Sequence, residues 1–371
     1  MELIHLANVN STNIGNGALI CGLERVYAED LPTARLNREP WDDYTFGRKA
    51  FDREFVRRVN ASHGLIVNGA VAINGRAYLG HAGMRLDLPL SLWREIERPV
   101  VFHGISYRHW AGTPFHHLDR LKEVLAHILG NRKMLLAVRN DGTREWLAGL
   151  AGIAPDLLAE VPDSGIFVAP RKGDDPEIVA GRTNIVLAVN NEDATERYAG
   201  RKEHVLAGIV GTLVKLAEQR NANLILAPHY LDDFRMVGEI FERLPPRIAH
   251  QHVITTGLAR VDAAGRFYGR YAQMDLVLAM RVHAMSPAIG MGVPLVVLAS
   301  QGRMSNFLRK VGLSELGVDV FAEDFADRLW TAVERTLAKP EVVRGRLQAT
   351  AAALRADMRA FIARVAALLA G

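Results

Sequence analysis

Short apolar runs alternate with longer stretches of helical periodicity along the first half of the chain. The apolar runs predict strands at residues 3–8, 65–68, 100–103 and 134–138. The periodic stretches predict helices at residues 18–27, 115–129 and 144–150. Because parallel strands need long crossover connections, and helices usually supply them, this order predicts a parallel sheet covered by helices.

The same alternation begins again after a charged, turn-rich stretch at residues 171–177, which is typical of a linker. Strands are predicted at residues 184–189, 223–227, 252–256, 276–279 and 295–298. Helices are predicted at residues 203–220, 232–244, 284–291 and 305–311, and the stretch at 340–369, rich in Ala, Leu and Arg, predicts one or two long helices.

We therefore predict an α/β protein with two Rossmann-like, doubly wound domains facing a cleft. Residues 1–175 form the first domain, on the expected acceptor side, and residues 176–340 form the second, on the expected donor side. Residues 341–371 are expected to form a helix or helices that pack back on the first domain.

Composition narrows the class of protein. A length of 371 residues exceeds one ordinary domain, and a net charge of +4 without a basic run gives no support for nucleic-acid binding. The single cysteine, Cys21, excludes an intramolecular disulfide framework and a cysteine-rich zinc site. No uncharged apolar run approaches the roughly 18 residues that cross a bilayer. We expect a cytoplasmic protein, and the sequence leaves open peripheral association with the inner face of the membrane and a homo-oligomer.

Arg281 and His283 interrupt an otherwise apolar stretch at residues 275–298. Arg281 keeps its charge and can grip a carboxylate or phosphate, while His283 can gain or lose a proton near neutral pH. They stand where a parallel strand ends and a helix begins, which is where open α/β sheets bind ligands. The alternative is structural: Arg281 would pair with a neighbouring acid, and His283 would cap a backbone carbonyl.

A glycine motif follows the first predicted strand and precedes a helix. Its candidate binding residues are Asn13, Gly15, Asn16 and Gly17. Glycines permit a tight turn, and amides at the start of a helix can hold an anion. The GxGxxG spacing of a dinucleotide site is absent, and a plain strand-to-helix turn would explain the glycines equally well.

Two further candidates lie at predicted strand ends. Arg139 ends the strand at 134–138 and should lie at its carboxyl edge, while Asp141 or Thr143 caps the next helix. His229 ends the strand at 223–227, and Asp232 or Asp233 starts the helix that follows. A histidine in such a place is more often a packing or capping residue than a ligand of substrate.

Several familiar chemistries can be set aside. The chain contains no GxxxxGK[ST] phosphate loop, no HExxH zinc helix and no GxSxG nucleophile turn. Histidines gather at His103, His109, His116 and His117, but adjacent side chains do not face one ligand and no acidic cluster accompanies them. We therefore expect no metal site.

Taken in order, these motifs resemble the polysaccharide pyruvyl transferase family. The matching segments are residues 13–18, 138–141 with Thr143, 162–164, Pro228-His229 with Asp232, and 281–283 followed by 288–294. The resemblance implies a GT-B-like fold and transfer of a pyruvyl group from phosphoenolpyruvate to sugar hydroxyls of a glycan or lipid-linked saccharide, forming a ketal. It implies no cofactor besides phosphoenolpyruvate as co-substrate.

The resemblance also implies roles for residues. Arg281 would bind the anionic groups of the donor and His283 would be the catalytic histidine. The other expected substrate-binding residues are Asn13, Gly15, Asn16, Gly17, Arg139, His229, Val282 and Arg303. For the acceptor sugar, Tyr78, Arg85 and Trp110 are candidate contacts.

The chain departs from the family pattern at three places. Members commonly carry an arginine after the first strand of the second domain, where this chain has residues 187–191 without one, and Arg197 or Arg201 would replace it. Asn16 stands where an acid is common, and residues 67–69 stand where glycines are common. Two alternatives follow: a GT-B nucleotide-sugar glycosyltransferase, or a non-catalytic glycan-binding or scaffold protein with a degenerate site.

Overall fold

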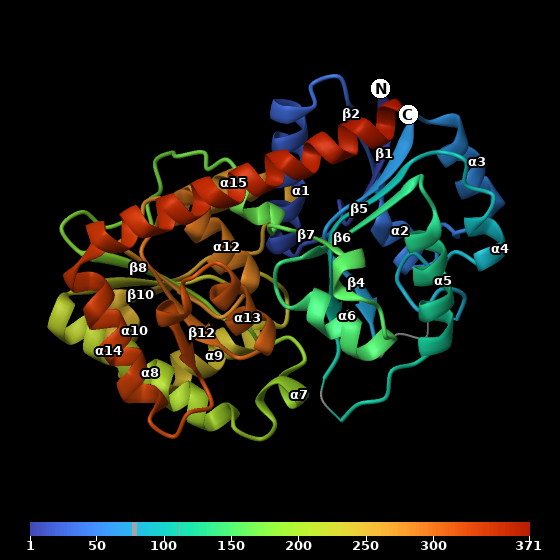
Figure 1. Cartoon of the computed structure of the whole chain (residues 1–371). Coiled ribbons are helices and arrows are strands. Elements are labelled where there is room, and N and C mark those ends of the chain that lie inside the picture. The colour runs from blue at the N-terminus through green and yellow to red at the C-terminus, as the bar shows by residue number, and fades with distance from the viewer. Residues whose placement is uncertain (76–79, 111) are drawn as a thin grey trace. The chain divides into compact units, whose positions relative to one another are not determined.

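The computed structural model describes residues 1–75, 80–110 and 112–371. Contacts divide the chain into two compact units (Figure 1). The first unit contains residues 1–11, 22–164 and 354–371, and the second contains residues 12–21 and 165–353. In both units helices alternate with parallel strands, so the predicted two-domain α/β fold is confirmed.

The sheet of the first unit is parallel throughout. Its strands are β1 (Glu2–Ala7), β2 (Arg35–Pro40), β3 (Gly64–Val67), β4 (Val71–Asn74), β5 (Val100–Arg108), β6 (Met134–Arg139) and β7 (Ala159–Val161). They are ordered β2-β1-β3-β5-β6-β7, with β4 paired to β5. The order reverses between β1 and β3, so the carboxyl ends of these two strands form the switch point where ligands bind in such folds.

The sheet of the second unit has the strand order of a Rossmann fold. Its strands are β8 (Thr183–Ala188), β9 (Ala222–Leu226), β10 (Val253–Thr255), β11 (Leu276–Ala279), β12 (Leu295–Ala299) and β13 (Gly317–Asp319). The spatial order is β10-β9-β8-β11-β12-β13, all parallel, and its switch point lies between β8 and β11. All four residues of β11 are buried, as expected for a strand covered on both faces.

Helices connect the strands in both units. The helices within the first unit are α2 (Trp41–Thr45), α3 (Arg53–Ala61), α4 (Leu90–Trp93), α5 (Leu118–Gly130) and α6 (Thr143–Ala151). Those within the second are α7 (Ala194–Tyr198), α8 (Lys202–Arg220), α9 (Asp233–Arg243), α10 (Pro246–His252), α11 (Ala264–Tyr271), α12 (Val282–Met291), α13 (Gly302–Lys310) and α14 (Phe325–Ala338). Single-turn 3₁₀ helices span Pro155–Leu157, Ser164–Phe167, Val261–Ala263 and Ser314–Leu316.

Two helices, α1 (Ile14–Asp30) and α15 (Pro340–Ala370), contain residues of both units. The stretch expected to form one or two helices is the single long helix α15, drawn in red in Figure 1. Its last part belongs to the first unit, where Arg355 pairs with Glu29 at 2.8 Å and Phe361 meets the ring of His103 edge to face at 5.1 Å. In the described part of the chain, no helix is long and apolar enough to cross a membrane.

The stretch that the sequence suggested as a linker packs on α11. The amide of Arg171 donates to the carbonyl of Gly265 at 2.7 Å, and Asp175 pairs with Arg270 at 2.6 Å. Both residues therefore belong to the second unit, which begins at residue 165, before the expected boundary.

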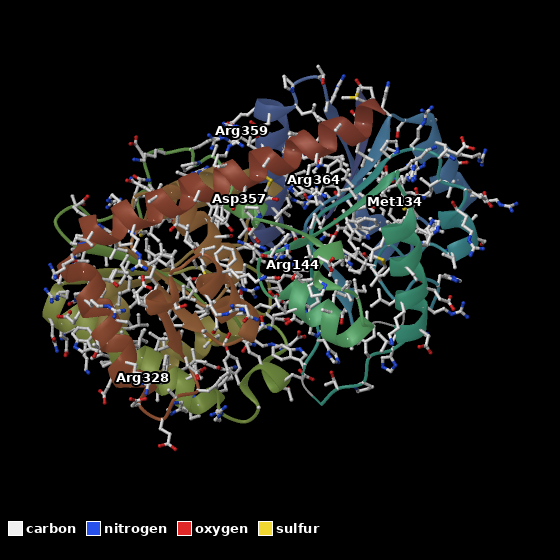
Figure 2. The ribbon with its side chains drawn as sticks, viewed as in Figure 1. Met134, Arg144, Arg328, Asp357, Arg359 and Arg364 are labelled. Carbon is white, nitrogen blue, oxygen red and sulfur yellow. The ribbon has the colours of Figure 1, made fainter. Side chains whose placement is uncertain are left out.

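Some charged side chains are exposed on the surface of each unit. Figure 2 labels Arg328 of α14 and Arg359 of α15, whose side chains are 59% and 67% exposed. Arg328 pairs with Asp324 at 2.6 Å, and Arg359 lies 3.4 Å from Asp30. Such exposed pairs contribute little to stability, so the apolar cores of the two units carry most of it.

Candidate active site

A buried polar residue follows most strands of the second sheet, at the carboxyl end. Those residues are Asn190 and Asn191 after β8, His229 after β9, Thr256 after β10, Arg281 after β11 and Ser300 after β12. Because the strands are parallel, these ends share one edge of the sheet. Charged groups that follow β8, β9 and β11 meet at this edge, beside the switch point between β8 and β11.

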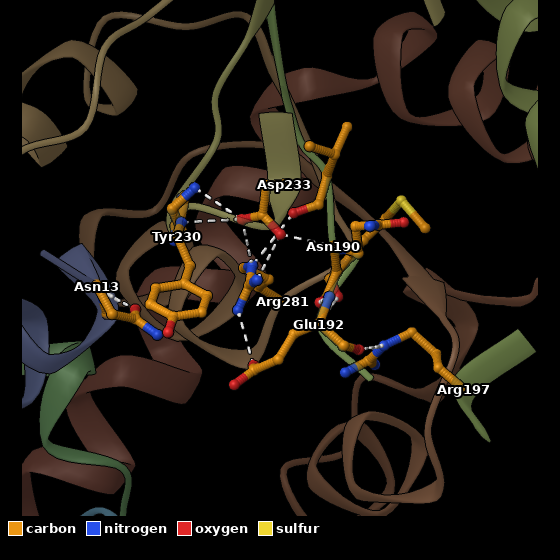
Figure 3. A network of polar contacts seen from close by, with 12 residues as sticks. Asn13, Asn190, Glu192, Arg197, Tyr230, Asp233 and Arg281 are labelled. Atoms are coloured by element: carbon orange, nitrogen blue, oxygen red, sulfur yellow. Dashed lines mark hydrogen bonds and ion pairs between the residues drawn. The ribbon is translucent and has the colours of Figure 1, made fainter. Parts of the chain in front are cut away.

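The carboxylate of Asp233, the first residue of α9, joins three of these loops (Figure 3). Its Oδ2 accepts hydrogen bonds from the amides of His229 at 2.9 Å and Tyr230 at 3.0 Å, and its Oδ1 accepts from the amide of Asn191 at 3.0 Å. The guanidinium of Arg281 donates to both oxygens, through Nε at 2.9 Å and Nη2 at 2.5 Å. One fully buried carboxylate therefore ties the loops after β8, β9 and β11 together.

Two carboxylates surround Arg281. Besides the bidentate pair with Asp233, its Nη1 lies 3.4 Å from Glu192, and its Nε also donates to the carbonyl of Val189 at 3.2 Å. Burial alone would lower the pKa of Arg281, but the charges and hydrogen bonds of Asp233 and Glu192 raise it above its ordinary value. The structural interpretation of Arg281 as a partner of acids is therefore seen in the structure, and a role in donor binding stays a prediction.

A second buried guanidinium, that of Arg197 in α7, lies beside this network (Figure 3). Its Nε donates to the carbonyl of Glu192 at 2.8 Å, and its Nη1 donates to the hydroxyl of Ser300 at 3.1 Å. Burial is the main cause that lowers the pKa of Arg197 to about 10. The charges of Arg281 and Arg303 also lower this pKa, while the charge of Glu192 acts in the opposite direction.

His283 lies in the first turn of α12, with the glycine motif directly against it. A Cβ atom on Gly15 would lie 2.6 Å from Nδ1 and 3.0 Å from Cβ of His283. A Cβ atom on Gly17 would lie 2.7 Å from the carbonyl oxygen of Val261. The absence of a side chain at both glycines therefore lets the start of α1 pack closely against His283 and Val261. Residues 12–21 accordingly belong to the second unit.

The first amides of α1 donate to acceptors within the protein. The amide of Gly15 donates to Oδ1 of Asn13 at 3.0 Å, and that of Asn16 donates to the carbonyl of Asn13 at 2.9 Å. The amide of Ile14 donates to the carbonyl of His229 at 3.1 Å. Where the sequence suggested an anion cradle, the amide of Ile14 joins α1 to the loop after β9, and the amides of Gly15 and Asn16 donate to Asn13.

His229 is fully buried among aromatic rings. Its Nε2 lies 2.7 Å from the hydroxyl of Tyr271, and its ring meets Phe267 edge to face at 5.2 Å. Burial, and then the charges of Arg281 and His283, hold the pKa of His229 well below its ordinary value. His229 is therefore neutral at physiological pH, and its surroundings match the packing interpretation.

Arg139 belongs to the first unit. It is buried at the end of β6, with its Nε 3.1 Å from Asp163. The expected cap of the next helix is wrong: α6 begins at Thr143, and no side chain caps it. Asp141 instead accepts from the hydroxyls of Ser106 at 2.6 Å and Thr143 at 2.5 Å, because those donors lie within reach of its buried carboxylate.

The other predicted residues fall in both units. Val282 begins α12, and Arg303 lies in the first turn of α13, where its Nη2 donates to Gln301 at 3.2 Å. In the first unit, Arg85 lies over the ring of Trp41 at 4.8 Å, and Trp110 accepts through its carbonyl from Thr113 at 2.7 Å. Tyr78 lies outside the described residues. Over residues 1–75, 80–110 and 112–371, no three His, Cys, Asp or Glu side chains gather as a possible metal site.

Known structures share this fold. The UDP-GlcNAc 2-epimerase from Methanocaldococcus jannaschii has a TM-score of 0.55 at 12% identity, covering 96% of this chain and 99% of its own. A glycosyltransferase from Rickettsia africae has a TM-score of 0.56 at 10% identity, covering 98% and 97%. The spinosyn rhamnosyltransferase SpnG has a TM-score of 0.51 at 13% identity, covering 98% and 100%. These likenesses confirm the GT-B-like fold.

Comparisons of sequence, rather than of structure, identify the family. No curated protein matches it. The family model described as polysaccharide pyruvyl transferase matches residues 13–302, from the glycine motif to the start of α13. This range includes His283, Arg281 and the loops that Asp233 joins. The chain therefore belongs to the polysaccharide pyruvyl transferase family.

Proposed function

We propose that this protein transfers a pyruvyl group from phosphoenolpyruvate to two hydroxyls of a sugar in a glycan, forming a cyclic pyruvate ketal. Family membership together with the position of His283 carries the proposal. His283 lies in the first turn of a helix at the switch point of a Rossmann-like sheet, two residues after the buried guanidinium of Arg281. This combination suits a small anionic donor that must accept a proton.

The reaction needs a proton donor and sites for two anionic groups. Protonation of the methylene carbon of phosphoenolpyruvate makes its second carbon electrophilic, and a sugar hydroxyl adds there and loses its proton. A second hydroxyl then displaces phosphate and closes the ketal. His283 supplies the proton in this proposal, a contribution typically worth 10²–10⁴-fold in rate.

The charge distribution suggests which arginines hold the donor. Arg281 pairs with Asp233 and Glu192, and Arg197 is a second buried guanidinium, in the helix that follows β8. We assign the carboxylate and phosphate of the donor chiefly to Arg197 and Arg303, because charge-assisted hydrogen bonds to anions are stronger than neutral ones. In this assignment Arg281 keeps the loops in place beside His283.

The acceptor in this proposal is a glycan or lipid-linked saccharide, and phosphoenolpyruvate is the only co-substrate. In the first unit, Arg85 donates to Asn8 at 3.1 Å and Thr45 at 2.8 Å, at the carboxyl end of β1. We assign acceptor contacts to this edge because it is the switch point of the first sheet. Work on a lipid-linked acceptor would place the protein in the cytoplasm at the inner face of the membrane.

The proposal is tested by incubating the protein with phosphoenolpyruvate and a panel of oligosaccharides. The expected result is a glycan heavier by one pyruvate less one water, with one phosphate released for each ketal. Transfer of a sugar from a nucleotide sugar in parallel reactions would instead support a glycosyltransferase. Binding of a glycan without turnover of any donor would support a non-catalytic role.

A further inference from the structure

Pro287 stands four residues after His283, inside α12. In an α-helix the amide of each residue donates to the carbonyl four residues earlier. Proline has no amide hydrogen, so Pro287 leaves the carbonyl of His283 without its normal helical donor. The residue proposed to transfer the proton therefore lies in a turn that lacks one of its backbone hydrogen bonds.

The hydroxyl of Tyr268 takes the place of that donor. It donates to the carbonyl oxygen of His283 at 2.6 Å. Tyr268 lies in α11 and is fully buried, with its ring packed against Phe267 at 5.3 Å and Tyr271 at 5.4 Å. Because the neighbouring rings fix the ring of Tyr268, they also fix the position of its hydroxyl relative to the carbonyl of His283.

We propose that Tyr268 is a positioning residue for His283, replacing the helical hydrogen bond that Pro287 cannot make. Gly15 limits the imidazole on one side, and Tyr268 holds the backbone that carries it. The inference rests on the proposed function in one respect only, that His283 transfers the proton. A tyrosine that merely filled the core would need its ring and not its hydroxyl.

The exchange Tyr268→Phe removes the hydroxyl and keeps the ring. Since misplacement of a reacting group by about 1 Å can cost about 10²-fold in rate, we expect kcat to fall at least about tenfold. The KM for phosphoenolpyruvate should stay within about twofold of wild type, because Tyr268 does not hold the donor. A purely structural role would lower the amount of folded protein and leave kcat per folded molecule unchanged.

A second exchange tests the role of Pro287 directly. In the double variant Tyr268→Phe/Pro287→Ala, the introduced alanine brings back an amide donor for the His283 carbonyl, so kcat should recover to within about threefold of wild type. Pro287→Ala alone should keep activity, since a carbonyl oxygen can accept two hydrogen bonds. The matched control is Tyr268→Phe/Pro246→Ala. Pro246 is the first residue of α10, where its amide would have no helical acceptor, so this variant should not recover.

The NMR signal of the His283 carbonyl carbon gives a readout that does not depend on turnover. With ¹³C-carbonyl histidine and ¹⁵N alanine, only the His81–Ala82 and His283–Ala284 pairs give signals. Tyr268→Phe should shift the His283 carbonyl signal, Pro287→Ala in that background should return it toward wild type, and His81 serves as the internal reference.

The outcomes separate this proposal from the proposed function. Loss of kcat in Tyr268→Phe with recovery only through Pro287→Ala supports the positioning role. Unchanged kcat in Tyr268→Phe, no recovery through Pro287→Ala, or equal recovery through Pro246→Ala overturns it. If the wild-type protein turns over no phosphoenolpyruvate, the proposed function fails, and the carbonyl signal decides alone: a shift that Pro287→Ala reverses supports positioning, and no shift overturns it.

Discussion

Asp233 and Arg281 form a bidentate ion pair in the interior of the second unit, between the loops after β9 and β11. The same carboxylate accepts three backbone amides, so its two oxygens receive five hydrogen bonds in all. An exposed pair of this kind would contribute little, but breaking a buried pair leaves an uncompensated charge. The pair therefore couples the charge of Arg281 to the geometry of the loops around His283.

Asp233→Asn should disrupt this arrangement while keeping the size of the side chain. The amide nitrogen of the new side chain would face hydrogen-bond donors without an acceptor, and Arg281 would lose its buried counter-charge. We therefore expect the free energy of unfolding to fall by about 3–5 kcal/mol. The neighbouring exchange Asp232→Asn is the control, because Asp232 makes no side-chain cap and should change stability by less than about 0.5 kcal/mol. Urea unfolding measures both.

The double variant Asp233→Asn/Arg281→Met separates charge from loop geometry. Removing both charges should return much of the lost stability, because no guanidinium is then left buried without Asp233. Hydrogen exchange at the amides of Asn191, His229 and Tyr230 should remain faster than in wild type, since the acceptor is still weakened. If the double variant is as unstable as Asp233→Asn alone, the broken ion pair is not the source of the lost stability.

Gly15→Ala should lower kcat by about ten- to a hundredfold, because the new methyl group would overlap His283 and push the imidazole aside. Steady-state kinetics with phosphoenolpyruvate measures the effect. Gly238→Ala is the matched control. Gly238 lies on α9, where an added Cβ atom would meet nothing within 4 Å, so alanine there should stabilise the helix by about 0.5–1 kcal/mol. Wild-type kcat in Gly15→Ala would contradict the close packing.

Arg197→Gln should raise the KM for phosphoenolpyruvate at least about tenfold. The exchange removes a buried positive charge, and losing a hydrogen bond between charged groups costs about 1.5–3 kcal/mol of binding free energy. Arg201→Gln is the control. The Arg201 side chain is exposed, donates to the carbonyl of Phe321 at 3.0 Å and lies over its ring at 4.5 Å. Equal effects of the two exchanges on KM would remove Arg197 from donor binding.

His103 makes stability depend on pH. Burial, and then the charge of His5, lower the pKa of His103 to about 3, against about 6.5 in an unfolded chain. As pH falls from about 6.5 to 3, the unfolded chain gains a proton that the folded one does not bind, so stability falls by up to about 1.4 kcal/mol per pH unit. Above pH 6.5 this contribution is constant.

His103→Gln should therefore flatten the decrease in unfolding free energy between about pH 6 and pH 4, as followed by urea titrations. His81→Gln, at an exposed position, should leave the slope unchanged. A slope in His103→Gln equal to that of wild type would contradict the buried neutral form of His103.

The sequence predicted most of the apolar strands, but it missed the polar edge strand β2 and the short strands β4, β7 and β13. The apolar residues of β11 and β12 mark strands covered on both faces. The edge strand β2, with the sequence RLNREP, carries four charged or polar side chains, so its composition favours a loop. The three-residue strands β7 and β13 are too short to show any periodicity.

The candidate site was predicted in part for the same reason. Arg281 and His283 stand out because they interrupt an apolar stretch, and both lie at the predicted strand end. The sequence left open whether Asp232 or Asp233 mattered, because only the fold brings Asn191 and Arg281 to the second of them. The contact of Tyr268 was missed, although the spacing between His283 and Pro287 already signals a carbonyl in need of a donor.

The central claim is that His283 protonates the methylene carbon of phosphoenolpyruvate during ketal formation. The most direct measurement is mass spectrometry of the glycan product after reaction in D₂O, with wild type and His283→Asn. The account predicts a pyruvate ketal whose methyl group carries one deuterium in the wild-type product, and a loss of rate of at least about 10²-fold in the folded variant. A ketal formed at the wild-type rate by His283→Asn, or a glycan that gains no pyruvate from phosphoenolpyruvate, would contradict it.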